Sequence, residues 1–134
     1  MVLVEPGITF GSTLFYRLLH HEPVVMNVDP LEEGTPDRKR DPYHSNQAVP
    51  TLLATRYREQ FHRKFPDLRI REIRWLSFVA YPFSGGFKSW SLIGERAARN
   101  LLSFERKLEP VLGRLFGFRL LMVIEKRQAE NQLP

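Results

Sequence analysis

The stretch Phe118-Arg119-Leu120-Leu121-Met122-Val123-Ile124-Glu125 is apolar at six of its eight positions. It follows a glycine and precedes a polar tail, and an apolar run of this kind is typical of a strand that is buried in a sheet. We predict a strand over Phe118–Glu125 and a flexible tail over 127–134, and we look upstream for the elements that this strand joins.

A second β-rich run lies upstream, over Leu68–Tyr81. Its alternation of apolar and polar residues slips once near Glu72, as a β-bulge or a change of register would cause. Between the two runs, apolar side chains recur at helical spacing over Glu95–Leu112. This half of the chain therefore predicts a strand, a helix and a strand.

The first half predicts a third strand and two further helices. Met1–Val4 is apolar without alternation, which suits a buried central strand of a parallel sheet. Helical spacing begins at Ser12, which we take as the N-cap, and a longer helix is predicted over Asn46–Phe65. The proline-rich segment 22–46 between them is predicted to be an exposed loop insertion. This order of strands and helices indicates an α/β protein.

Length and composition limit the class of protein further. The 134 residues correspond to one domain, 1–134, and 43% of them are hydrophobic, which excludes an intrinsically disordered chain. The sequence contains no cysteine, which excludes a disulfide scaffold, a zinc site with thiolate ligands and a cysteine nucleophile. No apolar run approaches the roughly 20 residues that cross a bilayer. We therefore expect a cytoplasmic protein without a membrane span.

The net charge of +5 is unevenly distributed. Residues 1–50 carry four Lys or Arg and seven acids, whereas residues 51–134 carry sixteen and eight. The basic half leaves open an alternative function, a small basic module that binds nucleic acid or an acidic partner. We favour a solvated basic face over nucleic-acid binding, because the cations straddle a helix end and a strand and match no RNA-binding motif. Seven of them fall within nineteen residues: Arg56, Arg58, Arg63, Lys64, Arg69, Arg71 and Arg74.

Four stretches, taken together, resemble the carboxyl-terminal half of a class I S-adenosylmethionine-dependent methyltransferase. They are Val2-Leu3-Val4-Glu5-Pro6-Gly7, Ser45-Asn46-Gln47-Ala48-Val49-Pro50, Tyr81-Pro82-Phe83-Ser84-Gly85-Gly86-Phe87 and Phe116-Gly117-Phe118-Arg119-Leu120-Leu121-Met122-Val123-Ile124-Glu125-Lys126. The resemblance implies that residues 1–5, 68–81 and 118–126 are the fifth, sixth and seventh strands of the family's sheet, the last two forming a pair that closes one edge. The chain would then be a partial Rossmann-like sheet of three strands and about three helices.

The resemblance does not extend to the family's cofactor site, which the first four strands build. The sequence has no Gly-x-Gly turn after a strand, so we assign no cofactor-binding residue, and S-adenosylmethionine is expected only in the full-length family. A seven-strand sheet needs about 200 residues, since one strand-helix unit takes roughly 30. The chain is then a truncated frame, a fragment or one half of a split protein, inactive alone. A separate amino-terminal half, or self-association, would use the exposed edge of residues 1–5.

Ligands of open α/β sheets bind outside the carboxyl ends of the strands. The resemblance makes segments 5–12 and 81–90, with the 22–46 insertion, the wall and lid of a pocket for a small-molecule methyl acceptor. The substrate-binding candidates are Glu5, Ser12, Tyr16, Tyr43, Asn46, Ser84, Lys88 and Trp90.

Three histidines are weak candidates for a base that removes a proton from the acceptor. For the adjacent pair we favour a structural role, because histidines at the end of a helix stabilise its dipole. Consecutive residues cannot share one helix face, so we predict no metal site. The histidines are His20, His21 and His44, and the acids that would orient them are Glu22, Asp29 and Asp41.

Two short segments have both a binding and a structural interpretation. Ser84-Gly85-Gly86 would form an anion-binding turn beside Lys88, or a plain turn between a strand and a helix, which we favour. Segment 41–46 would hold a polar acceptor or cap the helix that follows it, and the sequence favours neither.

Overall fold

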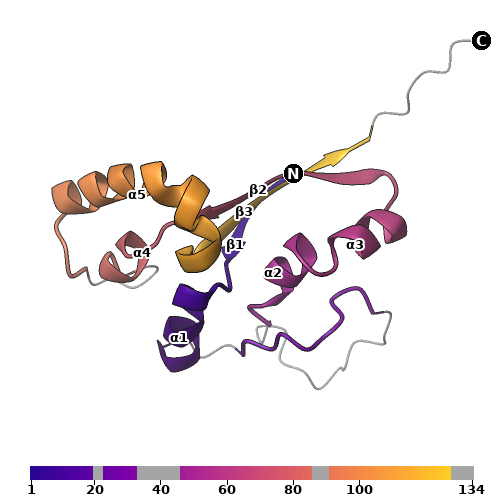
Figure 1. The fold of residues 1–134 in the computed structure, drawn as a ribbon, viewed down its shortest axis with the longest axis horizontal. Coiled ribbons are helices and arrows are strands. Elements are labelled where there is room, and N and C mark those ends of the chain that lie inside the picture. The colour runs from indigo at the N-terminus through magenta and orange to yellow at the C-terminus, as the bar shows by residue number, and fades with distance from the viewer. Residues whose placement is uncertain (20–22, 33–45, 86–90, 128–134) are drawn as a thin grey trace, which may run out of the picture.

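The computed structural model of the protein describes residues 1–19, 23–32, 46–85 and 91–127. Within them it has a mixed α/β fold, in which helices pack around one three-stranded sheet (Figure 1). In chain order the elements are β1 (Val2–Pro6), α1 (Phe10–Leu19), α2 (Val49–Ala54), α3 (Arg58–Lys64), β2 (Leu68–Leu76), α4 (Ala80–Phe83), α5 (Glu95–Phe116) and β3 (Arg119–Lys126).

The last strand of the chain lies in the middle of the sheet, in the order β1-β3-β2. It pairs antiparallel with both neighbours, so that Val4 and Trp75 lie opposite Leu121 and Leu120. The prediction of a central strand in a parallel sheet at Met1–Val4 is wrong for the described residues, because β1 is an edge strand that pairs only with β3. The predicted pairing of the last two strands is confirmed.

A bulge in β2 explains why its sequence alternates imperfectly. Ile70 lies opposite Ile124 while Glu72 lies opposite Val123, so Arg71 is one extra residue on β2. Because side chains on a strand alternate between the faces, the extra residue lets apolar residues on both sides of it face the same core. The predicted slip near Glu72 is confirmed.

β2 ends earlier than the run over Leu68–Tyr81 predicts. Ser77 has a positive φ of 54° and turns the chain out of the strand. The carboxylate of Glu105, whose residue is only 2% exposed, then accepts the backbone N–H groups of Phe78 at 2.9 Å and Ala80 at 2.8 Å. These two bonds satisfy donors at the start of the short helix α4, which replaces the predicted end of the strand.

The helix predicted over Asn46–Phe65 is two helices, α2 and α3. The chain leaves helical geometry at Thr55, which has φ −120° and ψ −91°, and the Tyr57 N–H returns to the carbonyl of Leu52 at 2.9 Å. The break lets α2 contact β1 and β3 while α3 contacts β2. An unbroken helix would follow only one of these directions.

Helix α1 begins at Phe10, two residues before the predicted N-cap Ser12. Thr9 caps it, because the Thr9 hydroxyl accepts the Ser12 N–H at 3.2 Å and the Ser12 hydroxyl accepts the Thr9 N–H at 2.8 Å. This reciprocal pair has the geometry of a capping box, with serine in place of the usual Glu or Gln. Ser12 is therefore the third residue of the helix rather than its cap.

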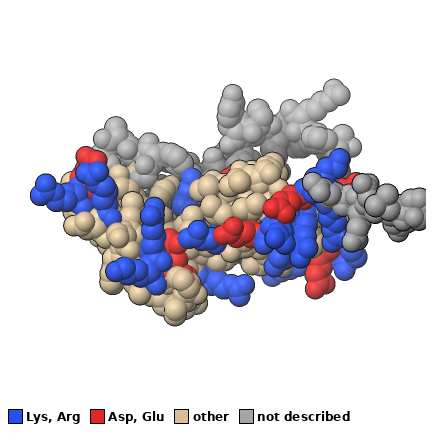
Figure 2. Space-filling view, turned by 90° about the horizontal axis from the view of Figure 1, so that it is seen from above, with Lys and Arg blue, Asp and Glu red and all other residues tan. Residues whose placement is uncertain are grey.

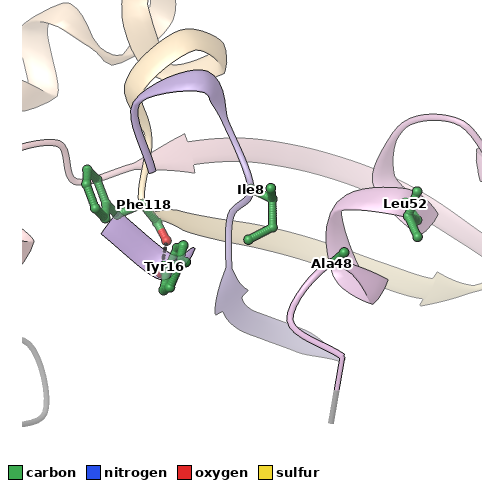
Figure 3. Packing of buried hydrophobic residues seen from close by; sticks show 5 residues of the cluster. All are labelled: Ile8, Tyr16, Ala48, Leu52 and Phe118. Carbon is green, nitrogen blue, oxygen red and sulfur yellow. Dashed lines mark hydrogen bonds between the residues drawn. The ribbon is translucent and has the colours of Figure 1, made fainter. Parts of the chain in front are cut away.

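The core lies between the helices and one face of the sheet. Figure 3 shows the group that joins α1 and α2 to the start of β3, and it consists of Ile8, Tyr16, Ala48, Leu52 and Phe118. A second group lies where α3 packs on the sheet, and it consists of Phe61, Ile70, Met122 and Ile124.

The opposite face of the sheet carries apolar side chains that are only partly covered. Residues directly opposite one another on paired strands share a face, so Val2 and Val4 lie beside Val123 and Leu121. Val2 is 64% exposed and Val4 is 48% exposed. This surface of four residues is called the valine face below.

Candidate functional site

The carboxyl ends of β1 and β2, where the sequence predicts a substrate pocket, do come together in the structure. Trp75, 9% exposed, fills the space between them. Gly7 and Gly117 lie so close to it that a Cβ on Gly7 would be 3.2 Å from the indole ring, and one on Gly117 would be 3.0 Å from the Trp75 Cβ. Glu5 lies beside this region, half-buried and opposite Leu120.

Ser12 is fully buried inside the turn between β1 and α1. Its hydroxyl donates to the carbonyl of Gly7 at 2.6 Å and accepts from the N–H of Thr9. Both bonds hold the chain where it leaves the sheet. The structure thus gives Ser12 a structural task at the predicted pocket wall.

Tyr16 also belongs to the core rather than to a surface. It is 1% exposed, and its hydroxyl donates to the carbonyl of Phe118 at 2.7 Å (Figure 3). Burial raises the pKa of Tyr16 to about 12, with a further increase from Tyr81 and an opposing effect from Arg119. The phenol is therefore neutral at physiological pH and acts as a hydrogen-bond donor.

Asn46 fixes one end of the 22–46 insertion. Its amide pairs with both backbone groups of Val25, accepting at 2.9 Å and donating at 2.8 Å, and its oxygen also accepts the Ala48 N–H at 3.1 Å. Of the two interpretations of segment 41–46, these bonds favour the structural one at Asn46. Its side chain joins the insertion to the start of α2.

Ser84 and Gly85 follow α4 in a local turn. The Ser84 hydroxyl donates to the Tyr81 carbonyl at 3.0 Å, and the Gly85 N–H donates to the Pro82 carbonyl at 3.1 Å. Gly85 has a φ of 81°, a left-handed conformation that glycine adopts without a steric penalty. The described part of the motif thus has the geometry of a plain turn.

Asp29 is the one acid of the predicted histidine-orienting set that lies within the described residues. Its carboxylate accepts the Leu31 N–H at 2.8 Å and the Gln60 side chain at 3.2 Å, which ties segment 23–32 to α3. The other candidates lie outside the described residues: His20, His21, Glu22, Asp41, Tyr43, His44, Lys88 and Trp90. Within the described ranges, no group of three His, Asp or Glu residues has the geometry of a metal site.

Helix α1 also has an exposed apolar side. Phe10, Leu14 and Leu18 recur at four-residue spacing, so they share one face of the helix. They are 83%, 66% and 71% exposed. Apolar side chains gathered in this way are typical of a surface that another chain or segment covers.

Glu105 is the structurally important residue that sequence reasoning missed. It lies four residues after Leu101 and three before Leu108, which places a carboxylate within the apolar stripe of α5. An acid at such a position has to find buried donors, and here it finds the amides of Phe78 and Ala80. That position in the stripe is the signal that would have identified it.

Comparison with known protein families, curated proteins and solved structures gave no match to this chain. Among the described helices, none is long and apolar enough to cross a membrane.

Proposed function

We propose that this chain is the carboxyl-terminal, substrate-pocket part of an S-adenosylmethionine-dependent methyltransferase that acts on a small molecule, and that it is inactive alone. The order and spacing of the four sequence stretches support this proposal. The structural observation that carries it is a contrast between the two edges of the sheet.

The β2 edge has the features of the outermost strand of a sheet. Arg69, Arg71 and Arg74 place three cations along it, and charges at an edge oppose pairing with a further strand. Side chains of helix α3 also form hydrogen bonds with the backbone of β2. Arg58 donates to the Ile70 carbonyl at 3.3 Å, and His62 accepts the Ile70 N–H at 3.2 Å. This edge is protected by charge and by hydrogen bonds.

Among the described residues the β1 edge is less protected, since Glu5 is the one charged residue of β1 and no described side chain bonds its backbone. Val2 and Val4 are apolar and exposed, and the exposed apolar face of α1 lies next in the chain. Edge strands of soluble proteins rarely stay uncovered in this way, whereas interior strands of larger sheets are apolar on both faces. In the proposal, the amino-terminal half of the methyltransferase pairs with β1 and covers the valine face.

The proposal divides the reaction between the two halves. S-adenosylmethionine, held by the amino-terminal half, supplies the electrophilic methyl group when bound. This chain would position the acceptor through the loops after β1 and β2, with Glu5 as a half-buried acid near the end of β1. Any base that removes the acceptor's proton would come from His20, His21 or His44.

Calorimetry with S-adenosylmethionine tests the division. The isolated chain should release no binding heat, and micromolar binding would contradict the claim that this chain lacks the cofactor site. Translation of the DNA upstream of the Met1 codon tests the resemblance. A strand, a Gly-x-Gly turn and an acidic residue about twenty positions later would support it, whereas a stop codon and a promoter would oppose it.

The edge itself is tested with the upstream half, or a second copy, as partner. Light scattering after size-exclusion chromatography should show a complex with the wild-type chain and separate, uncomplexed species with Val4→Lys. Glu72→Lys is the matched control, because it places the same side chain on the same face of the sheet at the β2 edge. Equal loss in both variants would contradict pairing at β1. A self-association that Val4→Lys breaks would identify a second copy of the chain as the partner.

The alternative function is a small basic module that binds nucleic acid or an acidic partner. Filter binding over a series of salt concentrations distinguishes it from the methyltransferase proposal. Phosphate contacts give a steep loss of affinity as the salt concentration rises. RNA binding with such a slope, together with an upstream stop codon, would replace the methyltransferase proposal.

A further inference from the structure

A basic hollow of about 520 Å³ lies between α3, the start of β2 and the end of β3. Figure 2 shows Lys and Arg side chains gathered toward this end of the molecule. It lies at the opposite end of the strands from the predicted substrate pocket, and its interpretation does not depend on the proposed function. The hollow is lined by Arg58, Glu59, His62, Arg69, Ile70 and Arg127.

Two of the lining side chains are held in place by one residue of β2. Arg58 donates to the Ile70 carbonyl at 3.3 Å, and His62 accepts the Ile70 N–H through Nε2 at 3.2 Å. Since Nε2 is the acceptor, the proton of the neutral ring is on Nδ1, which remains a donor. The guanidinium and the imidazole are thus partly ordered before any ligand arrives, which lowers the entropy lost on binding.

The positive charge of the hollow is poorly balanced. Arg69 and Arg127 make no ion pair with any residue in the described part of the chain. The one acid of the lining, Glu59, is 92% exposed at its side chain and faces Arg63 at 3.9 Å. Burial, followed by Arg58, Arg127 and Arg69, lowers the pKa of His62, as expected where three guanidinium groups surround one ring.

A neighbouring hollow extends this surface and shares two of its cations. Arg69 and Arg127 line both, and the second adds Lys126 and Arg71, the latter paired with Glu125 at 3.3 Å. A singly charged carboxylate would balance only part of the combined charge. A diphosphate or a phosphate monoester carries more charge, and its oxygens suit the paired N–H groups of arginine.

We propose that the hollow between α3, β2 and β3 binds a phosphate-bearing ligand through Arg58, Arg69 and Arg127, with His62 as an additional donor. The shared chemistry is a terminal phosphate or diphosphate group, whether on a free small molecule or on a lipid headgroup. The ligand neutralises guanidinium groups that otherwise repel one another, and this relief favours binding.

Titration calorimetry of the full chain with inorganic pyrophosphate is the primary test. Arg69→Gln and Arg127→Gln should each weaken binding about tenfold, as expected for the loss of one charge-assisted hydrogen bond. Arg63→Gln is the matched control on α3, because Arg63 lies outside the lining and is 74% exposed at its side chain. It should change the affinity less than twofold, because exposed charges contribute little.

Two readouts separate a site from general charge attraction. Saturation with pyrophosphate should raise the pKa of His62, because the bound anion favours the protonated ring. Nuclear magnetic resonance of the imidazole ring measures this pKa. Unchanged urea midpoints for the arginine variants would show that they fold. The proposal is overturned if folded wild-type protein binds neither pyrophosphate nor vesicles that contain phosphatidic acid, or if Arg63→Gln and Arg69→Gln lose affinity equally.

Parallel titrations identify the source of the phosphate. Binding of pyrophosphate in solution indicates a soluble ligand, and binding only to vesicles that contain phosphatidic acid indicates a lipid headgroup. Either result supports the site if Arg69→Gln weakens it. Binding of single-stranded RNA that Arg106→Gln on α5 weakens as much as Arg69→Gln does would instead show a diffuse basic surface, and would contradict the site.

Discussion

The hydroxyl of Tyr16 lies 2.7 Å from the carbonyl oxygen of Phe118 and donates to it across 102 residues of sequence. The bond joins α1 to the residue that precedes β3, and both residues are buried. It therefore links the first helix of the described chain to the central strand of the sheet.

Replacing Tyr16 with phenylalanine should lower the free energy of unfolding by about 1 kcal/mol near neutral pH, because the Phe118 carbonyl loses one of its two donors and keeps the Gly7 N–H at 2.9 Å. Urea denaturation measures the change. Tyr57→Phe is the control, since no described residue bonds the Tyr57 hydroxyl, and it should cost less than about 0.5 kcal/mol. Equal effects of the two substitutions would show that the bond contributes little.

The pKa of Tyr16 predicts how stability falls at high pH. It is about 12 in the folded protein against 10.0 for the free side chain, so the folded state favours the neutral phenol. The stabilisation is complete below pH 10 and is lost as the pH rises from 10 through 12, by up to about 2–3 kcal/mol. Tyr16→Phe should lose stability less steeply than wild type over this range. Parallel slopes in urea titrations would contradict the assignment.

Glu105→Gln should destabilise the protein by about 2 kcal/mol, because an amide offers one oxygen to the two buried N–H groups of Phe78 and Ala80. Thermal unfolding monitored by circular dichroism measures the loss. The same change at Glu95, whose side chain is 81% exposed on α5, should have little effect. An unchanged midpoint for Glu105→Gln would mean that the two amides find other acceptors.

Gly113 lies against Trp75 so closely that an added Cβ would be 2.7 Å from the Trp75 carbonyl oxygen. Gly113→Ala should therefore push α5 away from β2 and cost about 1–3 kcal/mol, as overpacking of a core does. Gly94→Ala is the matched control, because a Cβ there has no neighbour among the described residues within 4 Å. Denaturant unfolding of both variants checks the prediction, which fails if Gly113→Ala is as stable as wild type.

His62 should titrate below its usual 6.5 in the free protein, because burial and then Arg58, Arg127 and Arg69 disfavour its charge. Its stabilising effect is complete above pH 6.5 and falls as the pH drops below that value. Resonances of the imidazole ring report the pKa. Arg127→Gln should move it upward, whereas Arg63→Gln should leave it nearly unchanged, and a pKa above 6.5 in wild type would refute the assignment.

Local sequence pattern was enough to locate the strands and the main helix. The apolar run of β3 and the slip near Glu72 depend on neighbouring residues, and both are confirmed. The helix predicted over Glu95–Leu112 is confirmed as α5, which continues to Phe116. These features follow from periodicity, which a single sequence contains.

Features that depend on distant residues were predicted less well. The end of β2 depends on the carboxylate of Glu105, 27 residues beyond Phe78. The break between α2 and α3 follows from packing on different strands. The same reason explains Tyr16, which looks available in sequence but bonds the carbonyl of Phe118, 102 residues away. Ser12 differs, because its hydroxyl bonds the carbonyl of Gly7 within the local turn that precedes α1. The basic hollow likewise combines arginines from α3, from β2 and from the residue after β3.

The central position of β3 has a consequence for synthesis on the ribosome. β1 and β2 both take their sheet partner from residues 119–126, so neither can enter the sheet before nearly all of the described chain has been translated. At about 5–20 residues per second, Val2 and Val4 wait roughly ten seconds for that partner. During this interval the edge of β1 that later pairs with β3 is open to other nascent chains. We expect the yield of folded protein to depend on chaperones and on the rate of translation.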